Sequence, residues 1–265
     1  MTGDAQELAR VRNPVLLLSA AAWILLLANP GGMVGHAHFH AMRSGVMPLG
    51  ARFRMLLAMN PPAALAASWL LMLVAMMAPV LIPHVRHIRR RSFRRRRARS
   101  TALFAAGYGA IWMAVGAVVL AIDLAVKLFA QQSYLPAAGV LLLASVWQFS
   151  PSKQRCLNRC HANTELAAFG PAADLAALRF GVRHGLWCAA SCWALMLFPM
   201  LLPRGHVAAM AAVAVLILSE RLERPMPPAW RWRGLGTLTR IAIAQARIGM
   251  GARTRAARSL PALNA

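Results

Sequence analysis

The sequence predicts an all-α protein, a polytopic bundle of about six transmembrane helices with both termini on the cytoplasmic side. Of its 265 residues, 59% are hydrophobic, the mean hydropathy is +0.52 and seven residues are acidic. The apolar residues form continuous runs of about 20 residues, the length of α-helix that spans ~30 Å of hydrocarbon. The arginines gather between these runs. Together these features indicate membrane-spanning helices.

The arginines set the predicted orientation of the six spans. A dense block of arginines, from Arg86 to Arg99, lies between the second and third spans and marks the cytoplasmic side. Counting spans from that block places the N-terminus and the C-terminus inside. The predicted spans cover residues 13–29, 61–83, 101–130, 134–149, 179–202 and 205–222.

The chain divides into a transmembrane helical domain, residues 1–222, and a basic cytoplasmic tail, residues 223–265. Arg233, Arg240 and Arg247 recur every seven residues in the tail. This spacing predicts a basic amphipathic helix on the inner membrane surface, with a disordered basic tail as the alternative.

The net charge of +23 would suggest nucleic acid as the partner of a soluble protein. Here the arginines flank apolar runs, so anionic membrane lipids are the expected partners and nucleic acid is not. The expected location is the bacterial inner membrane.

Four cysteines form two pairs with the same spacing, Cys156 with Cys160 and Cys188 with Cys192. On a helix the members of each pair share a face, but their side chains run parallel, which disfavours a disulfide. Both pairs lie toward the cytoplasmic side, where thiols stay reduced. Thiolates there suit Cu(I) or Zn(II), so these cysteines are candidate metal ligands.

The second cysteine pair follows Gly181 and Gly185, which leave room on the same helix face for another helix to approach closely. The rise of 1.5 Å per residue places Met72 and Met76, in the second span, at the depth of this pair. Both methionines are candidate ligands, with ordinary packing as the alternative.

The first cysteine pair follows Pro151, at the inner end of the fourth span. On straight helices the two pairs would differ in depth by roughly 10 to 20 Å. Either residues 151–178 fold back to form one shared cysteine site, or the chain holds two sites in relay.

Histidines supply further candidate ligands. His36, His38 and His40 lie in a predicted outer loop that would capture metal before entry, unless the loop is simply solvated. His184 precedes Cys188 by one helical turn and is either a mixed ligand or an ordinary interface residue.

The sequence contains no motif typical of a hydrolase or an ATP-driven pump, so we do not expect an enzyme. Asp123 and Lys127, one turn apart near the outer end of the third span, are expected to neutralise each other rather than to carry protons.

Four motifs in combination resemble a bacterial family described as predicted metal-binding integral membrane proteins, domain of unknown function 2182. The motifs are Trp69-x2-Met72-x3-Met76-Met77-x-Pro79, Gly107-Tyr108-x3-Trp112, Trp147-Gln148-x2-Pro151-x-Lys153-x2-Cys156-x3-Cys160 and Gly181-x-Arg183-His184-Gly185-x2-Cys188-x3-Cys192-Trp193-x-Leu195-Met196. The resemblance implies metal binding in a membrane.

The chain departs from that family in two places. Ala190 and Ser191 stand where relatives often have a glycine and a further cysteine, and Gly205-His206-Val207 replaces a different start of the last span. If the further cysteine is a ligand in relatives, this chain would use fewer thiolates, with His206 or a methionine as a substitute.

The leading functional hypothesis is a membrane protein that binds a soft transition metal, copper ahead of zinc, and transports or delivers it. A metal chaperone or a partner membrane protein would then exchange metal with it. The alternatives are a non-transporting assembly or structural subunit with a structural metal site, and a thiol redox protein that passes electrons to quinone.

Overall fold

The computed structural model describes residues 3–28, 48–129, 133–167 and 169–231, together with residues 233, 236, 239–240 and 243–245 of the tail. Within these residues the regular structure is entirely helical, which confirms the all-α prediction for this part of the chain. The elements are α1 (Gly3–Ala28), α2 (Leu49–Met59), α3 (Pro62–Met77), η2 (Pro79–Leu81), α4 (Ile82–Arg91), η3 (Arg94–Arg96), α5 (Arg97–Phe129), α6 (Leu135–Phe149), α7 (Pro151–His161), α8 (Gly170–Met200) and α9 (His206–Leu222).

Each of the six predicted spans coincides with a helix, but fewer than six have the length and composition of a span. Only α1 and the η3–α5 segment qualify among the described helices, and α2 with α3 qualifies as a third span if this pair, bent by 58°, is counted as one. Helices α6 and α9 have 15 and 17 residues, short of the ~20 that cross the hydrocarbon. Helix α8 is long, but its first half carries Arg179, Arg183 and His184.

Helices α5 and α8 pack most closely, and glycines make this possible. A Cβ added to Gly181 would collide with the backbone of Phe104, and one added to Gly107 would lie 2.5 Å from the carbonyl oxygen of Leu178. At Gly185 it would lie 3.2 Å from the carbonyl oxygen of Tyr108. The predicted close approach of a helix to this face of α8 is therefore made by α5.

Side-chain hydrogen bonds to backbone carbonyls tie α1 and α3 to this pair. Ser19 Oγ and Trp23 Nε1, both on α1, donate to the carbonyl of Ala75 on α3 at 2.7 and 3.1 Å. Trp69 Nε1 on α3 donates to the carbonyl of Trp112 on α5 at 2.9 Å. The three helices therefore form a layer on which α8 and α9 pack, and this layer fixes the register of the residues around the cysteines.

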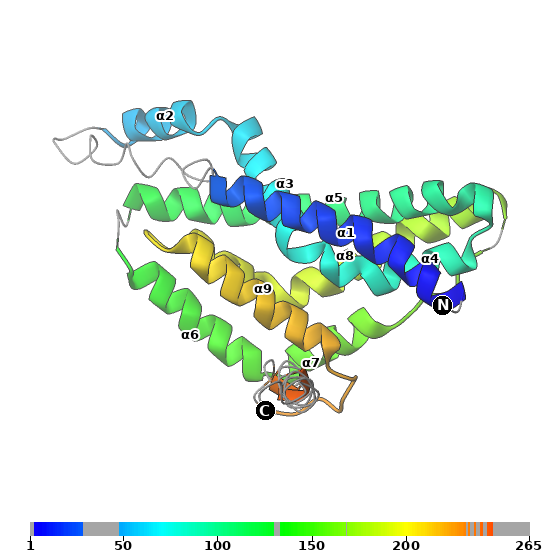
Figure 1. The fold of residues 1–265 in the computed structure, drawn as a ribbon. Helices are drawn as coiled ribbons and strands as arrows, with labels where there is room; N and C mark the ends of the chain where they lie inside the picture. Colours follow the sequence, from blue (N-terminus) through cyan, green and yellow to red (C-terminus); the bar gives the residue numbers. More distant parts are fainter. Residues whose placement is uncertain are drawn as a thin grey trace, which may run out of the picture.

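Basic and acidic side chains hold the N-terminal end of α1 beside the arginine block. Glu7 lies 3.8 Å from Arg90 and 3.8 Å from Arg97. Figure 1 shows that end of α1 next to α4, while α2 lies at the opposite end of the molecule. The start of α1 and the arginine-rich turn thus share one end of the fold, as the predicted orientation requires.

At Arg233, the first arginine of the seven-residue repeat, the tail differs from the predicted surface helix. Arg233 is 1% exposed and lies among the ends of α6 and α7, where carbonyl and amide oxygens surround its guanidinium. Arg240 is exposed, and Arg247 lies outside the described residues. Burial of Arg233 is tolerated because four hydrogen bonds connect its guanidinium to oxygen acceptors.

Candidate metal centre

Along α8, a side chain with a potential metal donor recurs at every fourth position. These are His184, Cys188, Cys192, Met196 and Met200, and each is between 0 and 8% exposed. Residues four apart on an α-helix lie one above the other, about 6 Å along the axis. Each member of the row is rotated by about 40° from the one before, so neighbouring donors share a side of α8, while the row of one imidazole, two thiols and two thioethers winds around the helix.

The short helix α7 begins with a strong local signal. Ser150 caps it, its Oγ accepting the backbone N–H of Lys153 at 3.1 Å, and Pro151 occupies the first turn, where its missing N–H costs nothing. The chain thus reverses from α6 into α7 within one residue, and α7 packs against α8.

Contacts from α4 and α9 anchor the far end of α7. His84 Nε2 lies 2.9 Å from the carbonyl oxygen of Cys160, and His161 Nε2 lies 3.2 Å from that of Arg221. The sequence left open whether residues 151–178 fold back. In the structure the first half of this segment, helix α7, folds back against α8. The fold-back buries Cys156 and Cys160 against α8, the helix that carries the second cysteine pair.

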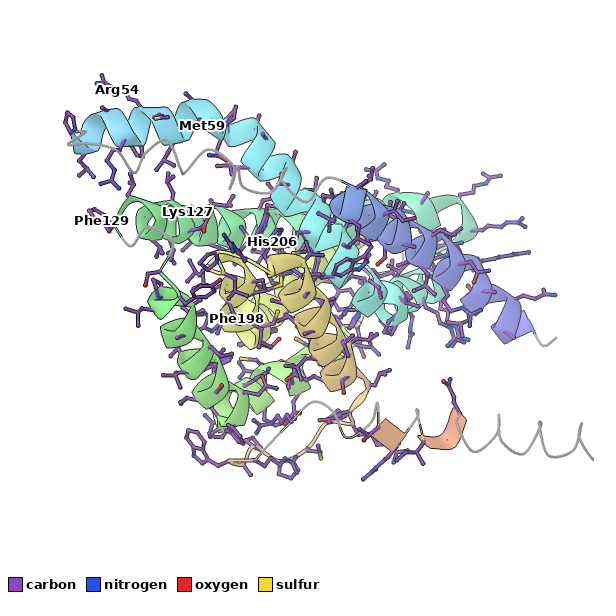
Figure 2. All side chains as sticks on the ribbon, turned by 60° about the vertical axis from the view of Figure 1, so that its left-hand side comes forward. Arg54, Met59, Lys127, Phe129, Phe198 and His206 are labelled. Atoms are coloured by element: carbon purple, nitrogen blue, oxygen red, sulfur yellow. The ribbon has the colours of Figure 1, made fainter. Side chains whose placement is uncertain are left out.

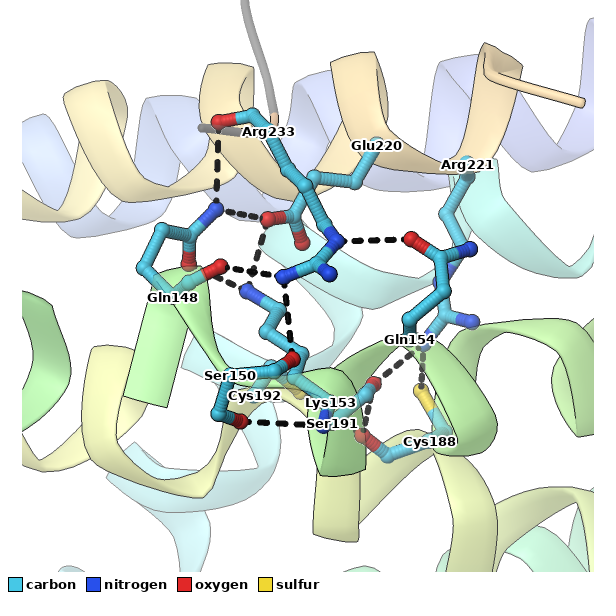
Figure 3. Close-up of polar contacts among 10 residues, drawn as sticks. All are labelled: Gln148, Ser150, Lys153, Gln154, Cys188, Ser191, Cys192, Glu220, Arg221 and Arg233. Atoms are coloured by element: carbon cyan, nitrogen blue, oxygen red, sulfur yellow. Dashed lines mark hydrogen bonds and ion pairs between the residues drawn. The ribbon is translucent and has the colours of Figure 1, made fainter. Parts of the chain in front are cut away.

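The side chain of Arg221, at the end of α9, joins the two cysteine pairs. Its Nη2 donates to Cys188 Sγ at 3.2 Å and to Ser191 Oγ at 2.9 Å. The same guanidinium lies beside the thiol of Cys160. Figure 3 shows Arg221 reaching past Gln154 toward Cys188 and Ser191. Thiols from α7 and α8 thus meet at one positive charge.

Neighbouring groups engage the two thiols of α8 differently. Tyr108 Oη lies 3.5 Å from Cys188 Sγ, so this sulfur has two polar neighbours, a hydroxyl and a guanidinium. Cys192 Sγ instead donates its proton to the carbonyl of Cys188, one turn earlier, at 3.0 Å. All four cysteines are free. Cys188 is therefore the sulfur best placed to accept hydrogen bonds as a thiolate.

Burial sets the protonation of the groups contributed by α4 and α7. It raises the pKa of the Cys160 thiol to about 12, an effect that the nearby Arg221 only partly offsets, and it also raises the pKa of Cys156. Burial lowers the pKa of His84 to about 4, so its imidazole is neutral at pH 7. Metal binding at Cys160 must therefore displace a proton.

His84 and His184 pack against each other with their ring centroids 3.8 Å apart and their planes tilted by 40°. Phe104, Tyr108 and Phe180 surround the pair. His184 Nε2 is buried and has no hydrogen-bond partner among the described residues. Sequence reasoning singled out His184 but missed His84, which follows the second predicted span and looked like part of its basic flank.

The candidate methionines lie in the same apolar core as the second cysteine pair. Met72 is 1% exposed and Met76 3%, and both belong to the cluster that contains Cys188 and Cys192. Met210, on α9, is fully buried in the same cluster. The outer-loop candidates His36, His38 and His40 lie outside the described residues.

A second polar network adjoins the thiols without touching them. Lys153 Nζ donates to Glu220 Oε1 at 2.6 Å, and Gln148 contacts both of these side chains. Arg233 Nε donates to Gln154 Oε1 at 2.6 Å and its Nη1 to two carbonyls (Figure 3). This network closes the junction of α6, α7 and α9 beside the candidate centre.

The opposite end of the molecule holds a separate ion pair. Lys127 Nζ lies 2.6 Å from Asp123 Oδ2, as expected for mutual neutralisation. Figure 2 shows Lys127 and His206 at this end, together with Phe129 and Arg54. His206, considered at the sequence level as a substitute ligand, therefore lies away from the thiols, since α9 carries it at the end opposite Arg221.

The donor set fits a soft monovalent metal better than a preformed zinc site. Within the described part of the chain, no three side chains of histidine, cysteine, aspartate or glutamate converge on one point. Structural zinc takes four ligands in a tetrahedron. Buried thiols and thioethers are the donors that Cu(I) prefers, and Cu(I) is satisfied by two of them in a line.

Comparison with known proteins identifies a family. The model of the family described as PpoB2: Copper chaperone matches residues 66–244, which include all four cysteines, Met72, His84 and Arg221. Neither a curated protein nor a solved structure matches the chain.

Proposed function

Because the chain belongs to the family described as PpoB2: Copper chaperone, we propose that it binds Cu(I) at its buried thiols and hands the ion on to an acceptor. The observation that carries this proposal is the meeting of Cys188, from α8, and Cys160, from α7, at the guanidinium of Arg221. The family description accounts for the metal, and these residues account for how it is held.

The primary ligands in this proposal are Cys188 and Cys160, with Cys192 and Cys156 one turn away on the same two helices. Each thiol loses its proton as the Cu(I)–sulfur bond forms, and the metal keeps its oxidation state throughout. The neutral imidazole of His184, whose Nε2 has no partner among the described residues, is a further donor beside Cys188. Met72 and Met76 supply thioethers from α3.

The line of donors on α8 supports delivery as well as storage. Cu(I) passes between sulfurs by ligand exchange, in which an incoming donor binds before an outgoing one leaves. Neighbouring members of the row Met200, Met196, Cys192 and Cys188 are separated by about 6 Å along the axis and about 40° around it, so each exchange step would connect one donor with the next. Thioethers bind first and thiolates last, so exchange runs from the Met200 end toward the arginine-rich end.

We place this activity in the bacterial inner membrane, with all six predicted helices, α1, α3, α5, α6, α8 and α9, in one membrane domain. Helices α1 and α5 have the length and composition to span it. The shorter helices would reach across where the bundle and its bent α2–α3 pair thin the hydrocarbon. Anionic lipids would contact the arginine block, and a metal chaperone or membrane partner would exchange copper at the same end.

The decisive experiment measures bound copper in the purified full-length chain. We expect the wild type to retain Cu(I) against a chromogenic competitor and a variant with all four cysteines changed to serine to lose it. Ser145→Ala, on the exposed side of α6, is the control for detergent and handling. Equal copper in the wild type and the cysteine-free variant contradicts the proposal.

A structural copper site without delivery is the second candidate, favoured by the complete burial of Cys188 and Cys192 in the core. Reconstituted vesicles separate the two roles. Delivery predicts time-dependent transfer of Cu(I) to a chelator on the arginine-rich side, and a structural site binds copper without releasing it.

A further inference from the structure

One cation beside the thiols, Arg221, has neither a carboxylate partner nor a full set of oxygen acceptors among the described residues. Lys153 is paired with Glu220 at 2.6 Å, and Arg233 has oxygen acceptors on three sides. Arg221 forms no ion pair with a carboxylate in the part of the chain that the structure describes. Its donor Nη2 instead faces Cys188 Sγ and Ser191 Oγ.

This arrangement is costly while the thiols are protonated. The Nε and Nη1 atoms of Arg221 are buried, and an arginine keeps its charge at any pH that a protein meets. A buried charge without a counter-charge destabilises its surroundings strongly. The pocket therefore favours any bound species that brings one net negative charge next to the guanidinium.

The charge of the metal complex decides which ions meet that requirement. Cu(I) with two thiolates has a net charge of minus one, which cancels the charge of Arg221. A divalent ion with the same two thiolates is neutral and leaves Arg221 uncompensated. It would need a third thiolate to reach minus one, and no three such ligands converge among the described side chains.

Building on the proposed function, we propose that Arg221 is the specificity-determining residue of the centre, selecting a monovalent ion held by two thiolates over a divalent one. Arg221 does not bind the metal. It acts through Cys188, whose sulfur accepts its N–H, and it remains in place as the counter-ion of the loaded complex.

The position of Arg221 suits this role. His161 Nε2, on α7, lies 3.2 Å from its carbonyl oxygen, and the preceding residue, Glu220, is locked by Lys153. The backbone at the end of α9 is therefore held on both sides, and the guanidinium is held by its hydrogen bonds to Cys188 Sγ and Ser191 Oγ. Arg224, three residues later, is exposed and provides a matched arginine outside the pocket.

The test compares ions of two charges in the purified full-length protein. Dissociation constants for Cu(I) and Ag(I), and for Zn(II) and Cd(II), are measured by chelator competition in the wild type, Arg221→Met, Arg221→Lys and Arg224→Met. We expect Arg221→Met to weaken Cu(I) and Ag(I) about tenfold or more, the scale on which residues beyond the direct ligands tune metal affinity. Zn(II) and Cd(II) should bind equally well or better.

The controls separate charge from structure. Arg221→Lys keeps the charge and should stay within a few-fold of the wild type for Ag(I), and Arg224→Met should change nothing. Equal losses for monovalent and divalent ions in Arg221→Met, or no loss of Cu(I), overturn the inference while leaving copper binding intact. A wild type that binds neither Cu(I) nor Ag(I) overturns the proposed function, and this inference with it.

X-ray absorption of the Cu(I)-loaded wild type gives an independent test that requires no variant to fold. Charge selection predicts two thiolate sulfurs on copper, and neutral thioether or imidazole donors beside them leave the charge of the complex unchanged. Three or four thiolate sulfurs would give the complex a charge that Arg221 cannot cancel, and would overturn the inference.

Discussion

Helix α9 ends on two consecutive charged residues that enter two different pockets, and the contrast between the pockets separates structure from function. Glu220 meets Lys153, which is 0% exposed, at 2.6 Å, and Gln148 completes the set. Arg221 meets a thiol and a hydroxyl. In the first pocket the charges of Lys153 and Glu220 already cancel. The second becomes neutral only when a sulfur next to Arg221 loses its proton.

Removing one partner of the first pocket should produce the largest effect. Lys153→Met leaves the carboxylate of Glu220 buried without its cation, which costs about 3 to 5 kcal/mol. We expect a large fall in thermal unfolding temperature in detergent. The double variant Lys153→Met/Glu220→Leu, which removes both charges, should recover much of that stability. A double variant that is no more stable than Lys153→Met would show that the pair is not the neutral unit described above.

The second pocket should respond in metal binding rather than in stability. Cys188→Ser removes the sulfur that contacts Arg221 and Tyr108. Because Cys188 is a proposed direct ligand, we expect Cu(I) affinity to fall by more than about 100-fold, the upper end of the loss when only a supporting residue is removed. Unfolding of the metal-free protein should change little, because serine is close to cysteine in size and its hydroxyl still accepts a hydrogen bond from Arg221 Nη2. Competition titration and thermal unfolding of the same sample check both halves.

Cys156→Ser is the matched variant for that comparison, since Cys156 lies on α7 at the edge of the pocket and is 8% exposed. We expect its effect on Cu(I) affinity to be the smaller of the two. An equal loss of Cu(I) affinity in Cys156→Ser and Cys188→Ser would show that the sulfur beside Arg221 contributes no more to copper binding than the sulfur of Cys156.

The sequence predicted the helices well and this contrast poorly, for identifiable physical reasons. Apolar runs marked six helices, and Gly181 and Gly185 marked the face that α5 approaches, because both signals are local. Hydropathy alone did not separate a helix that spans a membrane from one buried inside the bundle. The count of clear spans therefore fell from six to two or three.

The pocket residues that were missed depend on tertiary contacts. Arg221 is one of several arginines at the predicted inner end of the last span. The residues next to it in the sequence give no sign of its contact with Cys188, 33 positions earlier. The fold-back of α7 had a local signal, the Ser150-Pro151 start of a helix, but the packing of that helix on α8 did not. Arg233 shows the same limit. Three arginines spaced seven residues apart predicted a helix on the membrane surface, but the fold buries the first of them.

The glycines between α5 and α8 let Tyr108 approach Cys188. A substitution at one of them should have a smaller effect, and this effect should be on stability. Gly181→Ala forces a methyl group into the backbone of Phe104, and overpacking of this kind costs about 1 to 3 kcal/mol. Gly109→Ala is the matched control on α5, because nothing lies within 4 Å of the added atom and alanine favours the helix. Unfolding of the two variants should shift in opposite directions.

The smallest predicted effect comes from a variant that removes the neutral partner of Cys188, the Tyr108 hydroxyl, and leaves the charged partner, Arg221, in place. Tyr108→Phe removes a hydroxyl 3.5 Å from the sulfur and leaves the ring, which packs against His184, in place. A neutral hydrogen bond contributes about 1 kcal/mol, so Cu(I) affinity should change no more than about tenfold. The hydroxyl carries no net charge, so the preference for Cu(I) over Zn(II) should stay the same. If Tyr108→Phe shifts that preference as much as Arg221→Met does, hydrogen bonding to the sulfur, rather than charge, makes the two pockets of α9 different.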